Sequence, residues 1–293
     1  MTLYQPGILE AVPAVGRYLT FQLVPDDNPT DELSCLSEMV TGTDMVIGIG
    51  PATLSRIGRR IDGLREPPCF TGCGISVPAT PAALWCWLRG SDRGELVHRS
   101  HALVDLLARG FMLDGVIDSF VYAGGRDLSG YEDGTENPKG DDALAAGFVS
   151  DCGPGINGSS FVAVQKWQHD LGRLARFTPD ERDATIGRRQ SDNKELEDAP
   201  ESAHVKRTAQ ESFTPEAFLL RRSMPWADPC GEGLVFVAFA SSFHPFEAQL
   251  QRMMGLGDGI PDALFRFTRP LSTSYFWCPP VLESKLDLRA LAL

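Results

Sequence analysis

Two adjacent carboxylates, Glu132 and Asp133, lie between Gly130 and Gly134 in the stretch GYEDGTENP. Glycine, aspartate and asparagine are common in turns, so a solvated polar turn is one interpretation of this stretch. A calcium loop is a poorer one, because the segment from Asp127 lacks the alternating oxygen ligands and the terminal glutamate that such loops need. A positioned carboxylate can also transfer protons, which makes the stretch a candidate for acid–base chemistry.

The five histidines are the next candidates. His98 and His101 lie three residues apart in ELVHRSHALV and could share a metal ion, but no third ligand is near them, and a polar helix face is the alternative. His169 and His244 fall where one element gives way to the next, so we expect structural roles for both. His204, in ESAHVKRT, is by sequence pattern alone a loop histidine.

The elements that must position these residues occur twice in the same order. Apolar alternation predicts strands, and apolar residues at helical spacing predict helices. In the first half we expect strands at 16–24, 44–51, 83–90 and 116–125, with helices at 29–42 and 94–111. In the second half we expect strands at 159–168, 216–224, 233–240 and 272–279, with helices from about residue 170 and at 245–255.

This order predicts an α+β fold of two ferredoxin-like βαββαβ domains packed together, of the dimeric α/β-barrel type. The N-terminal domain would cover residues 1–142 and end with the acidic loop, and the C-terminal domain would cover 143–293. With 293 residues, 43% of them hydrophobic, the chain is long enough for two such cores.

Charge and composition exclude several classes of protein. The net charge of -12 and the absence of a Lys/Arg-rich run argue against nucleic acid as a partner. The N-terminus has no basic segment followed by an apolar one, and no run of eighteen apolar residues occurs, so we expect a cytoplasmic protein that does not contact a membrane. The seven cysteines are odd in number and scattered, which is typical of buried or idle thiols.

A family resemblance emerges from an ordered series of motifs. GYEDG matches the GxxDG signature of the dye-decolourising peroxidases, a family of haem peroxidases. The segments FVAVQKWQHDL, IGRRQSDNKEL, SAHVKRT, FLLRRSMPW, GLVFVAF and FTRPLSTSYFW follow in the family's order and at roughly its spacing. The similarity covers residues 120–280, whereas the first 115 residues resemble the family only in element order. The resemblance also implies the twin ferredoxin-like fold, with one haem b per chain in the C-terminal half.

The resemblance implies an iron ligand and its hydrogen-bond partner. His204 occupies the position of the family's axial ligand to iron. The other nitrogen of such a histidine needs an acceptor. Members of the family use a carboxylate there, in a segment shortly before the FTRP-like strand, and the resemblance therefore nominates Asp262 in GIPDALFRFT. A helix-capping role after Pro261 is the alternative for this aspartate.

The resemblance also implies the residues that face peroxide. Asp133, the last acid of GxxDG, would transfer the proton, Glu132 would be a neighbour, and the two glycines would let the backbone approach the haem. Because side chains alternate along a strand, only one arginine of LLRRS can face the pocket. The family motif places Arg221 there with Ser223 beside it, where some members carry asparagine, and leaves Arg222 in solvent.

Further cofactor contacts follow from the same motifs. Arg188, directly after Ile-Gly, matches an arginine that pairs with a haem propionate, although a surface arginine is the alternative. Phe236 and Phe239 could supply apolar walls for the porphyrin, although aromatic residues in a strand are often plain core.

The implied function is a haem-dependent peroxidase that reduces hydrogen peroxide and oxidises organic donors, such as dyes and phenolics, by one-electron steps. The alternative is a haem-binding or haem-handling protein with incidental peroxidase activity. A homo-oligomer is expected. Residues 284–293 could be a short packing helix or a peptide that docks inside an encapsulin shell, as in some proteins of this family.

Overall fold

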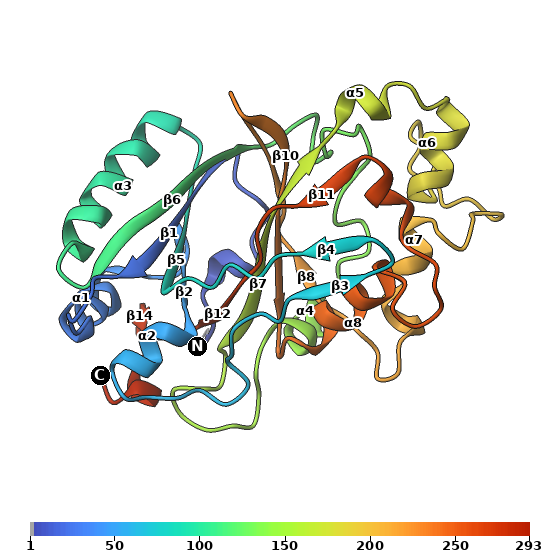
Figure 1. The fold of residues 1–293 in the computed structure, drawn as a ribbon. Helices are drawn as coiled ribbons and strands as arrows, with labels where there is room; N and C mark the ends of the chain where they lie inside the picture. The colour runs from blue at the N-terminus through green and yellow to red at the C-terminus, as the bar shows by residue number, and fades with distance from the viewer. Residues whose placement is uncertain (1–2) are drawn as a thin grey trace.

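The computed structural model describes residues 3–293, in which two sets of four antiparallel strands join into one closed ring (Figure 1). The first set has the order β2-β5-β1-β6 and the second has the order β12-β7-β10-β9. The strands of the first set are β1 (Val15–Leu23), β2 (Met45–Ile49), β5 (Leu84–Gly90) and β6 (Phe111–Phe120). Those of the second are β7 (Ser160–His169), β9 (Met224–Asp228), β10 (Gly231–Ala240) and β12 (Ser274–Cys278).

The ring closes at two seams between the sets. Trp277 of β12 pairs with Ile49 of β2, and Ser119 of β6 pairs with Trp226 of β9. Two short strands continue the ladders of the second set: β8 (Leu220–Arg221) pairs with β10, and β11 (Thr268–Pro270) pairs with β7. The mixed α and β composition and the repeated order of elements agree with the prediction from sequence.

Helices cover the outer faces of the ring. Helices α1 (Thr30–Met39) and α3 (Arg93–Leu107) lie beside the first set, and α8 (His244–Met253) and the short α7 (His204–Arg207) lie beside the second (Figure 1). The remaining helices are α2 (Pro51–Arg56), α4 (Gly140–Gly147), α5 (Leu171–Leu174) and α6 (Pro179–Ile186), with short 3-10 turns η1 (Pro6–Ile8), η2 (Gln210–Ser212), η3 (Ala263–Arg266) and η4 (Arg289–Leu291). Two small hairpins are formed by β3 (Phe70–Gly72) with β4 (Ile75–Val77) and by β13 (Val281–Leu282) with β14 (Lys285–Leu286). The division expected after residue 142 falls inside α4.

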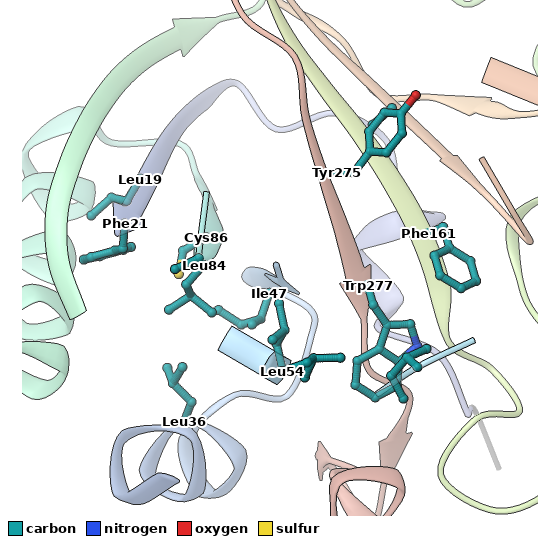
Figure 2. Packing of buried hydrophobic residues seen from close by; sticks show 14 of the residues in the cluster. Leu19, Phe21, Leu36, Ile47, Leu54, Leu84, Cys86, Phe161, Tyr275 and Trp277 are labelled. Atoms are coloured by element: carbon teal, nitrogen blue, oxygen red, sulfur yellow. The ribbon is translucent and has the colours of Figure 1, made fainter. Parts of the chain in front are cut away.

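Strand periodicity divides the core into two clusters. On β5, Leu84 and Cys86 point to the side covered by α1 and α2, where Leu36 and Leu54 pack (Figure 2). The alternate residue Trp85 belongs to the second cluster, which draws on strands of both sets. Successive side chains of a strand face opposite sides, so one sequence of apolar residues can fill both clusters.

None of the helices in residues 3–293 is long and apolar enough to cross a bilayer.

The C-terminal segment packs beside α1, which β14 contacts. Leu286, Leu288 and Leu291 are buried in the first core cluster, and Arg59 donates from Nε to the backbone oxygen of Leu291 at 2.8 Å. Of the two alternatives for residues 284–293, the structure therefore shows a packed segment, with a 3-10 turn in place of an α-helix.

We expect Leu291→Ala to lower the free energy of unfolding by about 2–5 kcal/mol, because it removes a fully buried side chain and leaves a cavity. Leu293→Ala is the matched control, since that leucine is 37% exposed and should change stability little. Denaturant unfolding of the two variants measures the difference. Equal losses of stability would show that the tail does not contribute through Leu291.

Candidate functional site

A cavity lies between the acidic loop and the second set of strands. Its wall is formed mainly by residues of the 127–133 loop, β7, α7, β10, α8 and η3, and half of the lining side chains are apolar or aromatic. Of the residues nominated from sequence, Asp133, His204, Arg221 and Phe236 line this cavity together. Its mixture of apolar walls with a few polar groups is typical of small-molecule and cofactor sites.

His204 is the first residue of α7 and has one ring nitrogen committed. Its Nδ1 lies 2.7 Å from Oδ2 of Asp262, a carboxylate that is 2% exposed. Oδ1 of the same aspartate accepts from the backbone nitrogen of Leu264 at 2.8 Å and caps η3. Asp262 thus makes both of the contacts that the sequence left as alternatives. Within residues 3–293 the Nε2 of His204 has no hydrogen-bond partner, so this nitrogen can bind a metal.

The helix that carries His204 is held by a buried arginine. Arg207, three residues further on, donates to both carboxylate oxygens of Asp258, at 2.7 and 2.9 Å, and to the backbone oxygen of Arg252. These hydrogen bonds lower the pKa of Asp258 to about 2. The pair ties α7 to the segment after α8 and so fixes the position of His204.

His169 lines the same cavity but has no free nitrogen. Its Nδ1 lies 2.6 Å from Oγ1 of Thr268, and its Nε2 lies 3.0 Å from Oδ1 of Asp127. Burial alone would raise the pKa of Asp127, but the hydrogen bonds from His169 and Ser129 outweigh it and lower the pKa below its usual value.

The three other histidines, His98, His101 and His244, are exposed. Residues 3–293 contain no group of three or more His, Cys, Asp or Glu side chains that could hold a metal ion by themselves. Any iron bound here would therefore need ligands from a cofactor in addition to His204.

The two acids of the loop lie in different surroundings. Glu132 pairs with Arg126 at 3.2 Å and accepts from Asn193 at 2.9 Å. Both residues line the cavity, but the carboxylate of Asp133 has no hydrogen-bond partner in the described part of the chain. Between the two, only Asp133 is free to exchange a proton with a bound molecule.

The glycines of the loop have a local conformational role. Gly130 and Gly134 have φ angles of +91° and +70°, in the left-handed region that other residues rarely adopt. A Cβ on either would also collide with a neighbouring side chain, that of Gln190 or Asn137. The turn geometry itself therefore requires glycine at both positions.

Asn137, from the end of the loop, clamps the backbone of Arg221. Its Nδ2 donates to the Arg221 carbonyl at 3.0 Å, and its Oδ1 accepts from the Arg221 N–H at 2.7 Å. Gln210, which is 6% exposed, donates to the Glu136 carbonyl at 2.7 Å and accepts from the Leu219 N–H at 3.0 Å. The sequence analysis assigned no role to either amide, because polar residues near turns are common and only their partners reveal the function.

The strand residues around Arg221 differ partly from expectation. Arg221 lines the cavity, whereas Ser223 lies in a neighbouring space of about 670 Å³ that also contacts Asp133 and Arg221. Arg222 is not solvated: it donates to the backbone oxygens of Ile8 and Leu9 at 2.8 and 2.9 Å. Burial and the charge of Arg89 lower the pKa of the Arg222 guanidinium. The reason for the difference is that the N-terminal segment covers this face of the strand.

Arg188 lies at the edge of the site, in a space of about 690 Å³ that Asp133, His204 and Arg221 also line. Its Nη2 pairs with Glu136 at 2.5 Å and lies 3.4 Å from Glu195. It is therefore paired with carboxylates of the protein rather than free on the surface.

Phe236 and Phe239 point to different places. Phe236 lines the cavity, but Phe239 is fully buried in the second core cluster, with its ring 6.3 Å from that of Trp85. Residues three apart on a strand face opposite sides, so only one of the two can line the site. The expectation for Phe239 was wrong.

Tyr131 is a further wall residue of the cavity. Its hydroxyl donates to Oδ1 of Asp183 at 2.5 Å, and burial together with this carboxylate raises the pKa of the phenol. The contact fixes the acidic loop against α6, which ends just before Arg188.

Comparison with known proteins places this site in a family. The sequence model of the family "Dyp-type peroxidase, C-terminal" matches residues 124–283, which include the acidic loop, His204 and Arg221. A dye-decolorizing peroxidase of Rhodococcus erythropolis is 29% identical over 246 residues, which cover 81% of this chain and 72% of the relative. One from Mycobacterium tuberculosis is 28% identical over 297 residues, covering 94% of this chain and 88% of the relative.

The fold is similar to that of solved members. A DypB variant from Rhodococcus jostii RHA1, solved in complex with haem, aligns with a TM-score of 0.82 over 93% of this chain and 94% of that one, at 24% identity. The family model covers more than half of the 293 residues, and the residues that it spans build the cavity described above. The chain therefore belongs to the Dyp-type peroxidase family.

Proposed function

We propose that this haem peroxidase reduces hydrogen peroxide and takes electrons one at a time from organic donors such as dyes and phenolics. The proposal rests on one observation: His204, whose Nε2 is free, lines the same cavity as Asp133 and Arg221. A ligand for iron and a pair of groups for peroxide chemistry are thus available to one bound molecule.

The residues present fit a haem. The cavity is mainly apolar, and an imidazole whose Nδ1 is bound to a buried carboxylate is a strong donor to iron. His204 would hold the iron, Phe236 would contact the porphyrin, and Arg188 and Arg221 are the cations near enough to the cavity to meet propionates. Bound haem supplies the redox chemistry between peroxide and the organic donor.

The protein's own groups would manage protons and charge. Asp133, whose carboxylate is not engaged, would accept a proton from one peroxide oxygen and return it to the other. Arg221 would stabilise the negative charge that develops as the oxygen–oxygen bond breaks. Glu132 is occupied by Arg126 and Asn193 and takes no part. Ser223 lines only the adjoining space, so it would influence the bound molecule indirectly.

A haem-handling protein is the alternative, because the fold and His204 would serve it equally well. The pairing of Asp133 with Arg221 favours the enzyme, since a carrier has no need of a free carboxylate and a guanidinium in the same cavity. We also infer that the two halves, residues 1–142 and 143–293, are both ferredoxin-like, because each set of strands has its fourth, first, third and second strands side by side in that order.

We expect His204→Ala to lose axial ligation, so that the Soret band of the haem-loaded protein shifts and less haem is retained per chain. Added imidazole should restore the band, since it replaces the missing ligand. His98→Ala, at an exposed position, is the control and should leave the absorbance spectrum unchanged. An unaltered spectrum for the His204 variant would refute the assignment.

We expect Asp133→Ala and Arg221→Ala each to slow the reaction with peroxide by at least about a hundredfold, while the Soret band of the resting enzyme is retained. Stopped-flow absorbance after mixing with peroxide measures the rate. Glu132→Ala should change it little. If the Glu132 variant were the slow one, the proton would pass through the other acid of the pair.

We expect Asn137→Ala to slow the same reaction by roughly ten- to a hundredfold, because small misplacements of catalytic groups have effects of that order. The haem spectrum should stay normal, since Asn137 does not contact His204. Asn193→Gly is the matched control: it also removes an amide beside the acidic loop but keeps the positive φ of that position and does not touch Arg221. Equal rates for the two variants would show that the contact with Arg221 is unimportant.

A further inference from the structure

A second hollow, of about 950 Å³, lies against the cavity and is open to solvent. It is bordered by the end of β7, α5, the start of β10 and the segment from η3 to β11; we call it the arginine groove. His169, Phe267 and Thr268 line both the groove and the cavity. The two spaces therefore share a wall made of these side chains.

Three arginines, Arg173, Arg266 and Arg269, line the groove, and all three are exposed. In residues 3–293 none of them has a carboxylate within 4.0 Å. Arg266 lies over the ring of Phe177, 4.2 Å from its centre, and Arg269 donates to Oε1 of Gln168 at 2.9 Å. The charges of Arg173 and Arg269 are therefore available to a ligand. That of Arg266 also acts on Glu181, whose pKa is lowered by hydrogen bonds from Thr178 and by the charge of Arg266.

Two carboxylates also line the groove, so its formal charge is one positive unit. One of them, Asp170, already accepts from the backbone nitrogen of Arg173 at 2.7 Å and caps α5. The other is Glu232. A positive groove on a chain of net charge -12 concentrates anions, and guanidinium groups bind carboxylates and sulfonates through paired hydrogen bonds.

The inner side of the groove is aromatic. Phe265 lines the groove, and its ring lies 5.6 Å from that of Trp167, which lines the cavity. Phe267, in the shared wall, has its ring 5.8 Å from that of His169. Both pairs lie at ordinary aromatic packing distances, so aromatic side chains continue from the groove into the wall of the cavity.

We infer that the arginine groove binds an anionic aromatic electron donor, a molecule with an oxidisable ring and a carboxylate or sulfonate. This inference rests on the proposed peroxidase function. Each donor would give up one electron across the shared wall, and a phenol would also release its hydroxyl proton. Two donors supply the two electrons which, with two protons, reduce one peroxide to two waters.

The test uses the haem-loaded enzyme with ferulate and methyl ferulate, two donors with the same phenol that differ in charge. In the triple variant Arg173→Gln/Arg266→Gln/Arg269→Gln, the ratio of kcat/KM for ferulate to that for methyl ferulate should fall by at least about tenfold. Ferulate binding without peroxide, followed by calorimetry, should weaken in parallel and should weaken with added salt in the unmodified enzyme. Arg176→Gln, an exposed arginine outside the groove, is the control and should leave the ratio unchanged.

An unchanged ratio in the triple variant, or an equal fall in the Arg176 control, would overturn the inference. Should the triple variant fold poorly, Arg173→Gln alone, whose guanidinium has no hydrogen bond in the described residues, gives the same comparison with a smaller expected effect. Failure of the proposed function would appear differently, as absence of peroxide-dependent turnover of both donors by the unmodified enzyme.

Discussion

The side-chain amide of Asn137 forms two hydrogen bonds with the backbone of Arg221, and the arrangement of the site depends on this contact. The acidic loop follows the last strand of the first set, whereas Arg221 belongs to a short strand of the second set, 84 residues away. Loops are usually more mobile than the elements they join. Because the Asn137 amide both donates to and accepts from the backbone of Arg221, it restricts the motion of the loop at the point where Asp133 and Arg221 must face the same molecule.

The closed ring of strands makes this contact possible. The seam between Ser119 and Trp226 brings the end of β6 beside β9. The chain leaves the strand directly afterwards, and the exposed Val121 follows two residues beyond the seam. From there the loop folds back through Gly130 and Gly134, whose positive φ angles no other residue type adopts easily. The cavity is thus a product of both halves of the chain, although most of its wall comes from the second.

Two histidine–aspartate pairs lie at the same cavity, and their different surroundings give them different capacities. Asp262 and Asp127 each accept from a buried or half-buried imidazole, so both histidines have a fixed ring orientation. Thr268 occupies the remaining nitrogen of His169, whereas the remaining nitrogen of His204 is open to the cavity. One pair can bind a metal, and the other stiffens the wall that separates the cavity from the arginine groove.

The sequence by itself determined the order of strands and helices, because apolar periodicity depends only on neighbouring residues. Through the family resemblance it also nominated the candidates Asp133, His204, Asp262 and Arg221, because the motifs that carry the resemblance are local. Contacts between distant segments were decided only by the tertiary structure: the clamp on Arg221 by Asn137, the burial of Arg222 under the N-terminal segment, and the packing of Leu291 into the core. The face taken by Phe239 was decided there too, since a strand's alternation becomes an inside and an outside only when the ring closes.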